Sequence, residues 1–241
     1  MKIAKIVSWL DRTLCVASFD DVSNNGVQVE SSGGGDAEVS RVAFAVDASA
    51  RTVRTAAAAG AQMLVVHHGI SWGGGVKRIA GGTYGVVKAA MDADLALYAC
   101  HLPLDAHQRL GNNAQLAKHL GLSKVRPAFS YHGNVIGCIG ESPRARKVGI
   151  GGRAVVVPRG TVVGVCSGGA GEFAEEAKRL GCGLFVTGEA SWGDVIAAEN
   201  CAMKMVCCGH YETEVFGVRA VAGAMKRALK VGTVDLTEEL R

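Results

Sequence analysis

Short apolar, β-branched runs alternate with alanine-rich segments over much of this chain. Residues 42–46, 63–66 and 95–99 are runs of the first kind, and residues 49–60 and 83–93 lie between them with a helical pattern. Strands that alternate with helices of this length form βαβ units, in which consecutive strands run parallel. The alternation therefore predicts an α/β fold with largely parallel sheets.

A second block with similar alternation begins near residue 125. Its predicted strands are residues 135–139, 154–157, 162–166, 184–187 and 204–208, and its predicted helices are residues 172–181, 192–200 and 215–230. We expect two similar α/β halves, residues 1–125 and residues 126–241, with an approximate boundary. The last helix can also pack on the first half.

Two segments precede the first predicted strand. Apolar residues recur at helical spacing from Ile3 to Leu14, which predicts an amphipathic helix at the start of the chain. Residues 20–36 are polar and rich in asparagine and glycine, and we expect turns there.

Composition narrows the class of protein. Hydrophobic residues make up 49% of the chain and charged residues 20%, so it can bury a sizeable core and is not a disordered protein. The net charge of +4 is too small for a dedicated nucleic-acid scaffold. The eight cysteines include no C-x-x-C pair, and no secretion signal or membrane-spanning run is present. We therefore expect reduced thiols and a cytoplasmic location.

Potential metal ligands directly follow four predicted strands. These residues are His67 and His68, then His101 and Asp105, then Glu189, and finally His210 and Glu214. In open parallel sheets, ligands bind outside the carboxyl ends of the strands. The sequence therefore predicts a site at strand C-terminal ends, in the cleft between the two halves.

The types of ligand indicate which ions would bind. Histidine together with carboxylate suits Zn, Mn, Fe or Co, whereas Ca and Mg prefer oxygen. Five ligands of mixed type exceed what one tetrahedral ion with an open position needs, so we expect two divalent ions. A His-His pair by itself is more often structural, and His119 and His132 fit solvated positions. His107 either supports a metal ligand from behind the site or has no role in the site. Trp72 and Trp192 either line a pocket or belong to the core.

Six short motifs occur in order along the chain. They are Ser23-Asn24-Asn25-Gly26-Val27-Gln28-Val29, Val65-Val66-His67-His68-Gly69, Ala99-Cys100-His101-Leu102-Pro103-Leu104-Asp105, Gly111-Asn112-Asn113, Thr187-Gly188-Glu189 and Gly209-His210-Tyr211-Glu212-Thr213-Glu214. This ordered set resembles the dinuclear metal-centre family, also called GTP cyclohydrolase 1 type 2 or NIF-three-like. The resemblance extends from residue 23 to the closing helix.

The resemblance implies a role for each matching residue. The implied ligands of two metal ions are His67, His68, Asp105, His210 and Glu214. The resemblance also gives His101 a supporting or proton-handling role and Glu189 a role in orienting a ligand. Many members carry one or two histidines shortly after Thr-Gly-Glu, whereas this chain has Ser191-Trp192-Gly193-Asp194 there. The family's toroidal hexamer implies a homo-oligomer.

Two functions of different classes follow. The first is a metal-dependent hydrolase that acts on a small molecule, either a nucleotide or a related cyclic amidine or phosphate compound, as the GTP cyclohydrolase label implies. The alternative is a non-catalytic, metal-stabilised ring that serves as an interaction or regulatory protein.

Residues 142–171 carry five basic residues and no acidic residue before Glu172. They fit either a solvated loop or a patch that attracts phosphate, so nucleic acid is only weakly supported as a partner and a membrane is not expected.

Overall fold

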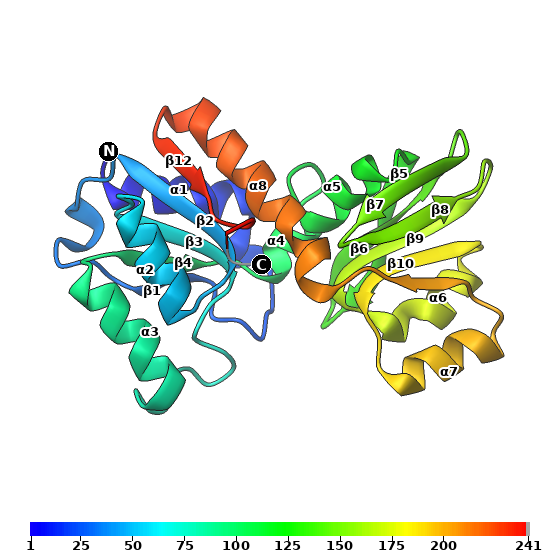
Figure 1. Cartoon of the computed structure of the whole chain (residues 1–241), viewed down its shortest axis with the longest axis horizontal. Coiled ribbons are helices and arrows are strands. Elements are labelled where there is room, and N and C mark those ends of the chain that lie inside the picture. The colour runs from blue at the N-terminus through cyan, green and yellow to red at the C-terminus, as the bar shows by residue number, and fades with distance from the viewer. Residues whose placement is uncertain (240–241) are drawn as a thin grey trace. The chain divides into compact units, whose positions relative to one another are not determined.

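The computed structural model describes residues 1–239, which form two compact units (Figure 1). Unit 1 consists of Met1–Leu104 together with the chain from Val218 onward, and unit 2 is Asp105–Gly217. These units divide the chain at Leu104 and Gly217, whereas the sequence predicted halves that meet near residue 125. The difference arises because α5 (Asn112–His119) packs on the sheet of unit 2.

A five-stranded sheet forms the centre of unit 1, in the order β1-β4-β3-β2-β12. Its strands are β1 (Gly26–Val29), β2 (Arg41–Asp47), β3 (Met63–His68), β4 (Ala96–Ala99) and β12 (Gly232–Asp235). The four strands β4, β3, β2 and β12 run parallel, and β1 pairs antiparallel with β4. The three strands predicted in this part of the chain are confirmed. The edge strands β1 and β12 were not predicted, and β1 lies within the stretch expected to form turns.

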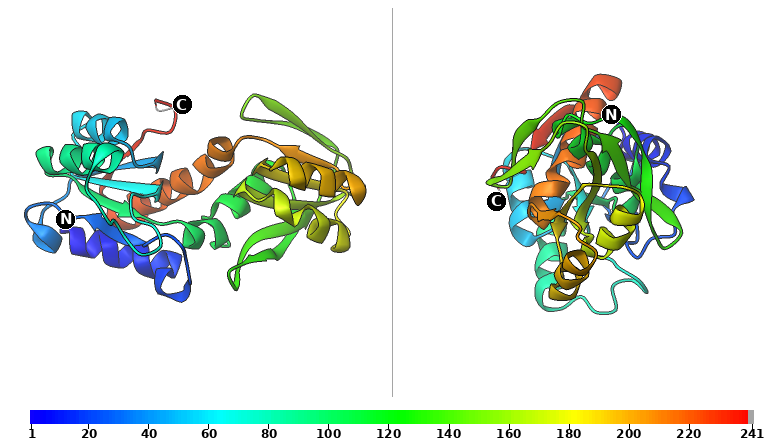
Figure 2. Two further views of the ribbon diagram at one scale, coloured as in Figure 1. Left: turned by 90° about the horizontal axis from the view of Figure 1, so that it is seen from below. Right: turned by 90° about the vertical axis from the view of Figure 1, so that its right-hand side faces the viewer.

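Helices cover both faces of this sheet. They are α1 (Ile3–Leu14), α2 (Ala50–Ala58), α3 (Gly81–Asp92) and the C-terminal part of α8 (His210–Leu229). In the left view of Figure 2, α1 lies on the opposite face from α2 and α3. Ala43 and Ala45 of β2 pack with Val53 of α2 and Val86 of α3 in one buried cluster, because alternate residues of a strand share a face.

Unit 2 contains a second five-stranded sheet, in the order β11-β10-β9-β6-β5. Its strands are β5 (Ser123–Tyr131), β6 (Asn134–Glu141), β9 (Val162–Gly169), β10 (Leu184–Glu189) and β11 (Met205–Cys207). The strands β9, β10 and β11 are parallel, whereas β5 and β6 pair antiparallel with each other and β6 pairs antiparallel with β9. The α/β class is confirmed, but this sheet is only partly parallel.

Two-residue turns explain two of the antiparallel pairs, β5 with β6 and the adjacent hairpin of β7 and β8. His132 and Gly133 connect β5 to β6 with φ values of +47° and +77°. Gly151 and Gly152 connect β7 (Arg146–Ile150) to β8 (Arg153–Val157) with φ values of +56° and +77°. Positive φ at both central residues is typical of the tight turn of a β-hairpin, which forces the two strands to run antiparallel.

The two faces of the unit 2 sheet are covered differently. On one face, α5 and the β7–β8 ribbon bury Leu116, Ile150 and Val155 in a single apolar cluster. The helix α6 (Ala174–Arg179) packs beside β10, and α7 (Trp192–Asn200) packs against α6. The remaining short helices are α4 (Leu102–Ala106), η1 (Val16–Ser18), η2 (Gly34–Asp36) and η3 (Gly171–Phe173). Among residues 1–239, no helix is long and apolar enough to cross a membrane.

Candidate metal centre

In unit 1, three parallel strands bring histidines to one edge of the sheet. Asp47 ends β2 and is the register partner of His68, which ends β3 after His67. His101 follows β4 by two residues. One donor atom from each of His67, His68 and His101 lies within 4.8 Å of the others, so the three imidazoles could hold a metal ion. His101, assigned a supporting role by the resemblance, is thus close enough to be a ligand itself.

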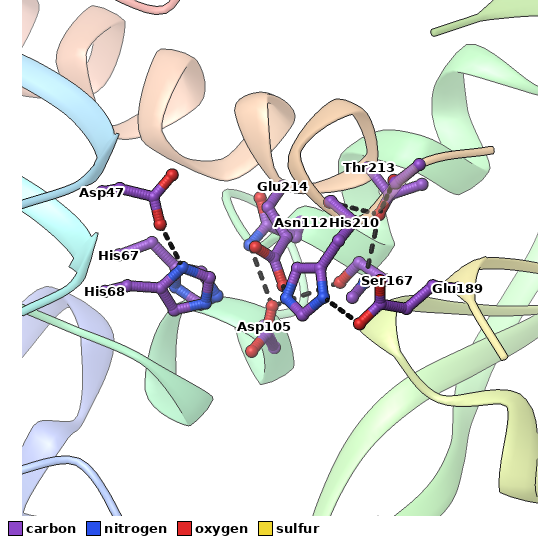
Figure 3. Close-up of polar contacts among 12 residues, drawn as sticks. Asp47, His67, His68, Asp105, Asn112, Ser167, Glu189, His210, Thr213 and Glu214 are labelled. Atoms are coloured by element: carbon purple, nitrogen blue, oxygen red, sulfur yellow. Dashed lines mark hydrogen bonds and ion pairs between the residues drawn. The ribbon is translucent and has the colours of Figure 1, made fainter. Parts of the chain in front are cut away.

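Each of these imidazoles is held through its Nδ1 atom. The Nδ1 of His67 lies 3.0 Å from the carbonyl oxygen of Cys100. The Nδ1 of His68 lies 2.8 Å from Oδ1 of Asp47 (Figure 3). The Nδ1 of His101 lies 2.9 Å from Oδ1 of Asp21. Carbonyl and carboxylate oxygens only accept hydrogen bonds, so we assign the proton to each Nδ1. Each ring then offers Nε2 as a metal ligand, as is usual for histidines in metal sites.

Asp21 is a site residue that the sequence analysis missed. Its side chain is only 2% exposed and also accepts hydrogen bonds from Asn25 Nδ2 at 2.8 Å and from the backbone N–H of Leu102 at 2.9 Å. Burial alone would raise the pKa of Asp21, but the hydrogen bonds from His101, Asn25 and Ser23 outweigh it and lower that pKa to about 2. The available signal was its place two residues before the Ser23-Asn24-Asn25-Gly26 motif.

In unit 2, the ends of β10 and β11 and the start of α8 bring His210, Glu214 and Glu189 together. The closing helix begins at His210, five residues before its predicted start, so His210 and Glu214 lie on one helix face. The Nε2 of His210 is 3.1 Å from Oε1 of Glu214, and its Nδ1 is 2.9 Å from Oε1 of Glu189 (Figure 3). Glu189 therefore holds the imidazole of His210 through Nδ1.

The carboxylates determine the charge on His210. The hydrogen bond with Glu214 has the largest effect on the pKa of His210 and raises it, whereas burial lowers it. Together with Glu189, the two carboxylates raise the pKa of His210 to about 9. In this structure the imidazole is therefore protonated at neutral pH, and a metal ion that binds Nε2 must displace that proton.

Asp105 lies in the short helix α4, and its side chain is held by residues of unit 2. Its Oδ1 accepts hydrogen bonds from Asn112 Nδ2 at 2.9 Å and from Ser167 Oγ at 3.2 Å. Oδ1 of Asn112 accepts in turn from the backbone N–H of Gly217 in α8. One oxygen of Asp105 and one of Glu214 lie within 4.8 Å of each other, and both side chains are buried.

Asn112 and Ser167 are thus positioning residues for Asp105. The Gly111-Asn112-Asn113 motif pointed to the first of them, but the sequence assigned it no role. The contact of Ser167 with Asp105 joins residues that are 62 positions apart in the sequence.

Glycines allow the backbone segments of unit 2 to pass close to one another near His210. The N–H of Gly168 donates to Thr213 Oγ1 at 3.0 Å, and the N–H of Gly209 donates to the carbonyl oxygen of Gly188 at 2.8 Å. A Cβ atom on Gly188 would lie 2.6 Å from the carbonyl oxygen of Gly168 and 2.9 Å from Cα of His210. Only glycine fits at position 188 without a backbone shift.

The other histidines have local contacts. Nδ1 of His107 accepts from the backbone N–H groups of Arg109 and Leu110, at 3.1 and 2.9 Å, as part of a turn. Nε2 of His119 lies 3.0 Å from the carbonyl oxygen of Gly149. His132 occupies the first position of the β5–β6 turn.

The thiols of Cys207 and Cys208 show no activation. Burial raises the pKa of Cys207, and it raises that of Cys208 to about 11. Both thiols are therefore protonated at neutral pH, which disfavours them as nucleophiles.

Comparison with known proteins gives consistent matches over nearly the whole chain. The family model described as Duf34/NIF3 (NGG1p interacting factor 3) matches residues 1–239. A protein named GTP cyclohydrolase 1 type 2 homolog from Pyrococcus horikoshii is 40% identical over 244 residues, which cover 95% of each chain.

Solved structures show the same fold. The structure of protein ybgI, described as of unknown function, has a TM-score of 0.83 and 29% identity, with 98% of each chain covered. The structure of reduced HcgD from Methanocaldococcus jannaschii also has a TM-score of 0.83 with 98% of each chain covered, and at 21% identity it supports the fold alone.

Proposed function

The chain belongs to the Duf34/NIF3 family, and on that premise we propose that it is a metal-dependent hydrolase with two divalent ions. The proposed ligands are His67, His68, Asp105, His210 and Glu214.

The observation that carries the proposal is the way in which the histidines are held. Nδ1 of each of His67, His68, His101 and His210 lies within 3.0 Å of a carbonyl or carboxylate oxygen. Unit 1 contributes three imidazoles with this support, and unit 2 contributes one that lies next to the buried carboxylate of Glu214. Nitrogen and oxygen donors of these types fit Zn, Mn, Fe or Co. An unsupported His-His pair on a surface would lack this feature.

Two divalent ions, when bound, would supply an activated water nucleophile and stabilise the charge that develops on attack. The chain itself positions the groups around them. Asn112 and Ser167 hold the Asp105 carboxylate, and Glu189 holds the imidazole of His210. Asp21 keeps the proton of His101 on Nδ1, which leaves Nε2 of His101 as an acceptor for a proton from the substrate or solvent.

The proposed substrate is a nucleotide or a related cyclic amidine or phosphate compound. The name of the Pyrococcus horikoshii relative supports this class. The exposed basic residues Arg144, Lys147, Arg153 and Arg159, on or next to the β7–β8 ribbon, would attract a phosphate group.

Metal content is the first test. We expect elemental analysis of protein purified without an affinity tag or chelator to give a ratio near two ions of Zn, Mn, Fe or Co per chain. The ratio should fall in His210→Ala. A ratio near zero that added ions do not restore would overturn the ligand assignment.

Activity is the second test. We expect the metal-loaded protein to open the ring of GTP or to hydrolyse a related nucleotide, and Asp105→Ala to abolish turnover. Lys226→Ala, in the last turn of α8, is the control and should retain activity.

A non-catalytic role is the second candidate, because the family description itself names an interaction factor. In that case the metal would stabilise a homo-oligomeric ring. Sedimentation of Asp105→Ala separates the two functions. Loss of turnover with an intact assembly supports catalysis, whereas disassembly on metal loss, without turnover of any nucleotide by the wild type, supports the structural role.

A further inference from the structure

An anchored, partly exposed indole lies beside the three imidazoles of unit 1. Trp72 follows β3 by four residues, and its ring centroid is 5.1 Å from that of His101 and 6.0 Å from that of His68. The indole meets the ring of His101 edge to face, at 76°. It therefore forms a wall of the histidine cluster.

We propose that Trp72 is the stacking surface that binds the planar heteroaromatic ring of the substrate next to this cluster. The inference rests on the proposed function for its site, and it adds the part of the substrate that is recognised there and the residue that recognises it.

Trp72 is held in place rather than free to rotate on the surface. Its Nε1 donates to the carbonyl oxygen of Gly69 at 3.1 Å, and its backbone pairs with Ser23 in an isolated β-bridge. Oε1 of Gln28 accepts from the N–H groups of Ile70 and Ser71, which fixes the preceding turn. A fixed aromatic ring loses little conformational entropy when a ligand stacks on it.

The exposed part of Trp72 can only offer its ring. The residue is 38% exposed, and its one polar hydrogen is already donated to Gly69. The glycines at 73, 74 and 75 that follow add no side chains, and a Cβ atom built on any of them would meet nothing within 4 Å. An exposed π-face favours flat, aromatic ligands over phosphate groups.

The neighbouring histidines explain why such a ring would bind there. A heterocycle stacked on Trp72 would lie near the rings of His101 and His68, whose centroids are 5.1 and 6.0 Å from that of the indole. Recognition of the ring would thus depend on Trp72, whose side chain carries no charge with which to bind a phosphate group.

The test uses the metal-loaded protein and two probes, GMP and ribose 5-phosphate, which has the sugar and phosphate without the ring. We expect Trp72→Leu to weaken GMP binding by about five- to 150-fold in calorimetric titration, the range typical of lost base stacking. Trp72→Phe should lie between this variant and the wild type, and binding of ribose 5-phosphate should not change. Trp192→Leu is the matched control, because Trp192 is 76% exposed at the start of α7, and it should bind GMP like the wild type.

Three results would overturn the stacking role. They are unchanged GMP affinity in Trp72→Leu, an equal loss for both probes in that variant, and no binding of GMP by the wild type. Circular dichroism and metal content of each variant show whether it is folded and loaded, and Trp72→Phe keeps the test valid if Trp72→Leu is unfolded. Ring-dependent binding without turnover would refute the hydrolase and leave the stacking role intact. Turnover with an unchanged KM in Trp72→Leu would refute the stacking role and leave the hydrolase intact.

Discussion

At the scale of single residues, the orientation of the imidazoles depends on the groups behind them. His68 and His210 are held by carboxylates, Asp47 and Glu189, whereas His67 is held by a backbone carbonyl. A carboxylate behind an imidazole fixes the tautomer and increases the basicity of the metal-binding nitrogen. The supporting carboxylates should therefore affect metal binding even though they are not among the proposed ligands.

Asp47→Asn tests this effect. The amide keeps the shape of the side chain but removes its charge, so we expect the affinity for Zn²⁺ to fall by about ten- to 100-fold. The measurement is competition with a chelating indicator at fixed pH. Asp92→Asn, which breaks only the exposed pair with Lys88 in α3, is the control and should bind Zn²⁺ like the wild type. Equal affinities in both variants would contradict a supporting role for Asp47.

At the scale of elements, the position of His210 depends on the close approach of β9, β10 and the start of α8. Glycines at 168, 188 and 209 make this approach possible, and Gly168 and Gly209 also have positive φ values of +67° and +99°. Most other residues would be strained in that conformation.

Gly188→Ala should destabilise the protein at this close approach of β9, β10 and α8. The added methyl group would press on backbone atoms of Gly168 and His210, so we expect the free energy of unfolding to fall by about 2 kcal/mol or more. Urea denaturation measures the change. Gly149→Ala in β7, where a Cβ atom would meet nothing within 4 Å, is the matched control and should change stability little. A similar loss in the free energy of unfolding of both variants would indicate that the close approach at Gly188 is not the cause.

The ionised form of Asp21 stabilises the segment before β1. Its pKa is lowered from 3.8 to about 2 in the folded protein, so the folded state binds fewer protons than the unfolded state between these values. The stabilisation is complete above pH 4 and is lost as the pH falls through 2, by about 2 kcal/mol. Asp21→Asn should remove this part of the pH dependence in unfolding measurements from pH 5 to pH 2. A variant with the same acid dependence as the wild type would exclude Asp21 as its source.

At the scale of the whole molecule, the chain crosses between the two units twice, after Leu104 and within α8 after Gly217. The proposed ligands are distributed over both units, with His67 and His68 in unit 1 and Asp105, His210 and Glu214 in unit 2. A metal ion that binds only the folded state stabilises it by mass action.

Metal should therefore raise the melting temperature of the protein. At a free Zn²⁺ or Mn²⁺ concentration 100 times the Kd, we expect about 2.7 kcal/mol of added stability. Scanning calorimetry with and without EDTA measures the shift. Mg²⁺ at the same concentration is the control and should have a smaller effect, because it binds nitrogen ligands poorly. Identical transitions with Zn²⁺ and with EDTA would show that no such site stabilises the fold.

The sequence by itself determined the elements whose signals are local. The run Met63-Leu64-Val65-Val66 predicted β3, and α7 occupies the predicted residues because Ser191 and Asp194 form a capping box at its start. The placement of histidines and acids just after strands also came from the sequence, since a parallel sheet gathers such residues at one edge.

Only the tertiary structure decided the contacts between residues far apart in the chain. Asp21 contacts His101, which is 80 residues away in the sequence, and Ser167 contacts Asp105, which is 62 residues away. The edge strands β1 and β12 are short and owe their form to pairing with β4 and β2. Local periodicity specifies which residues form a helix or a strand, but the choice of partner depends on packing and hydrogen bonds that close long loops, and no short window of sequence contains both partners.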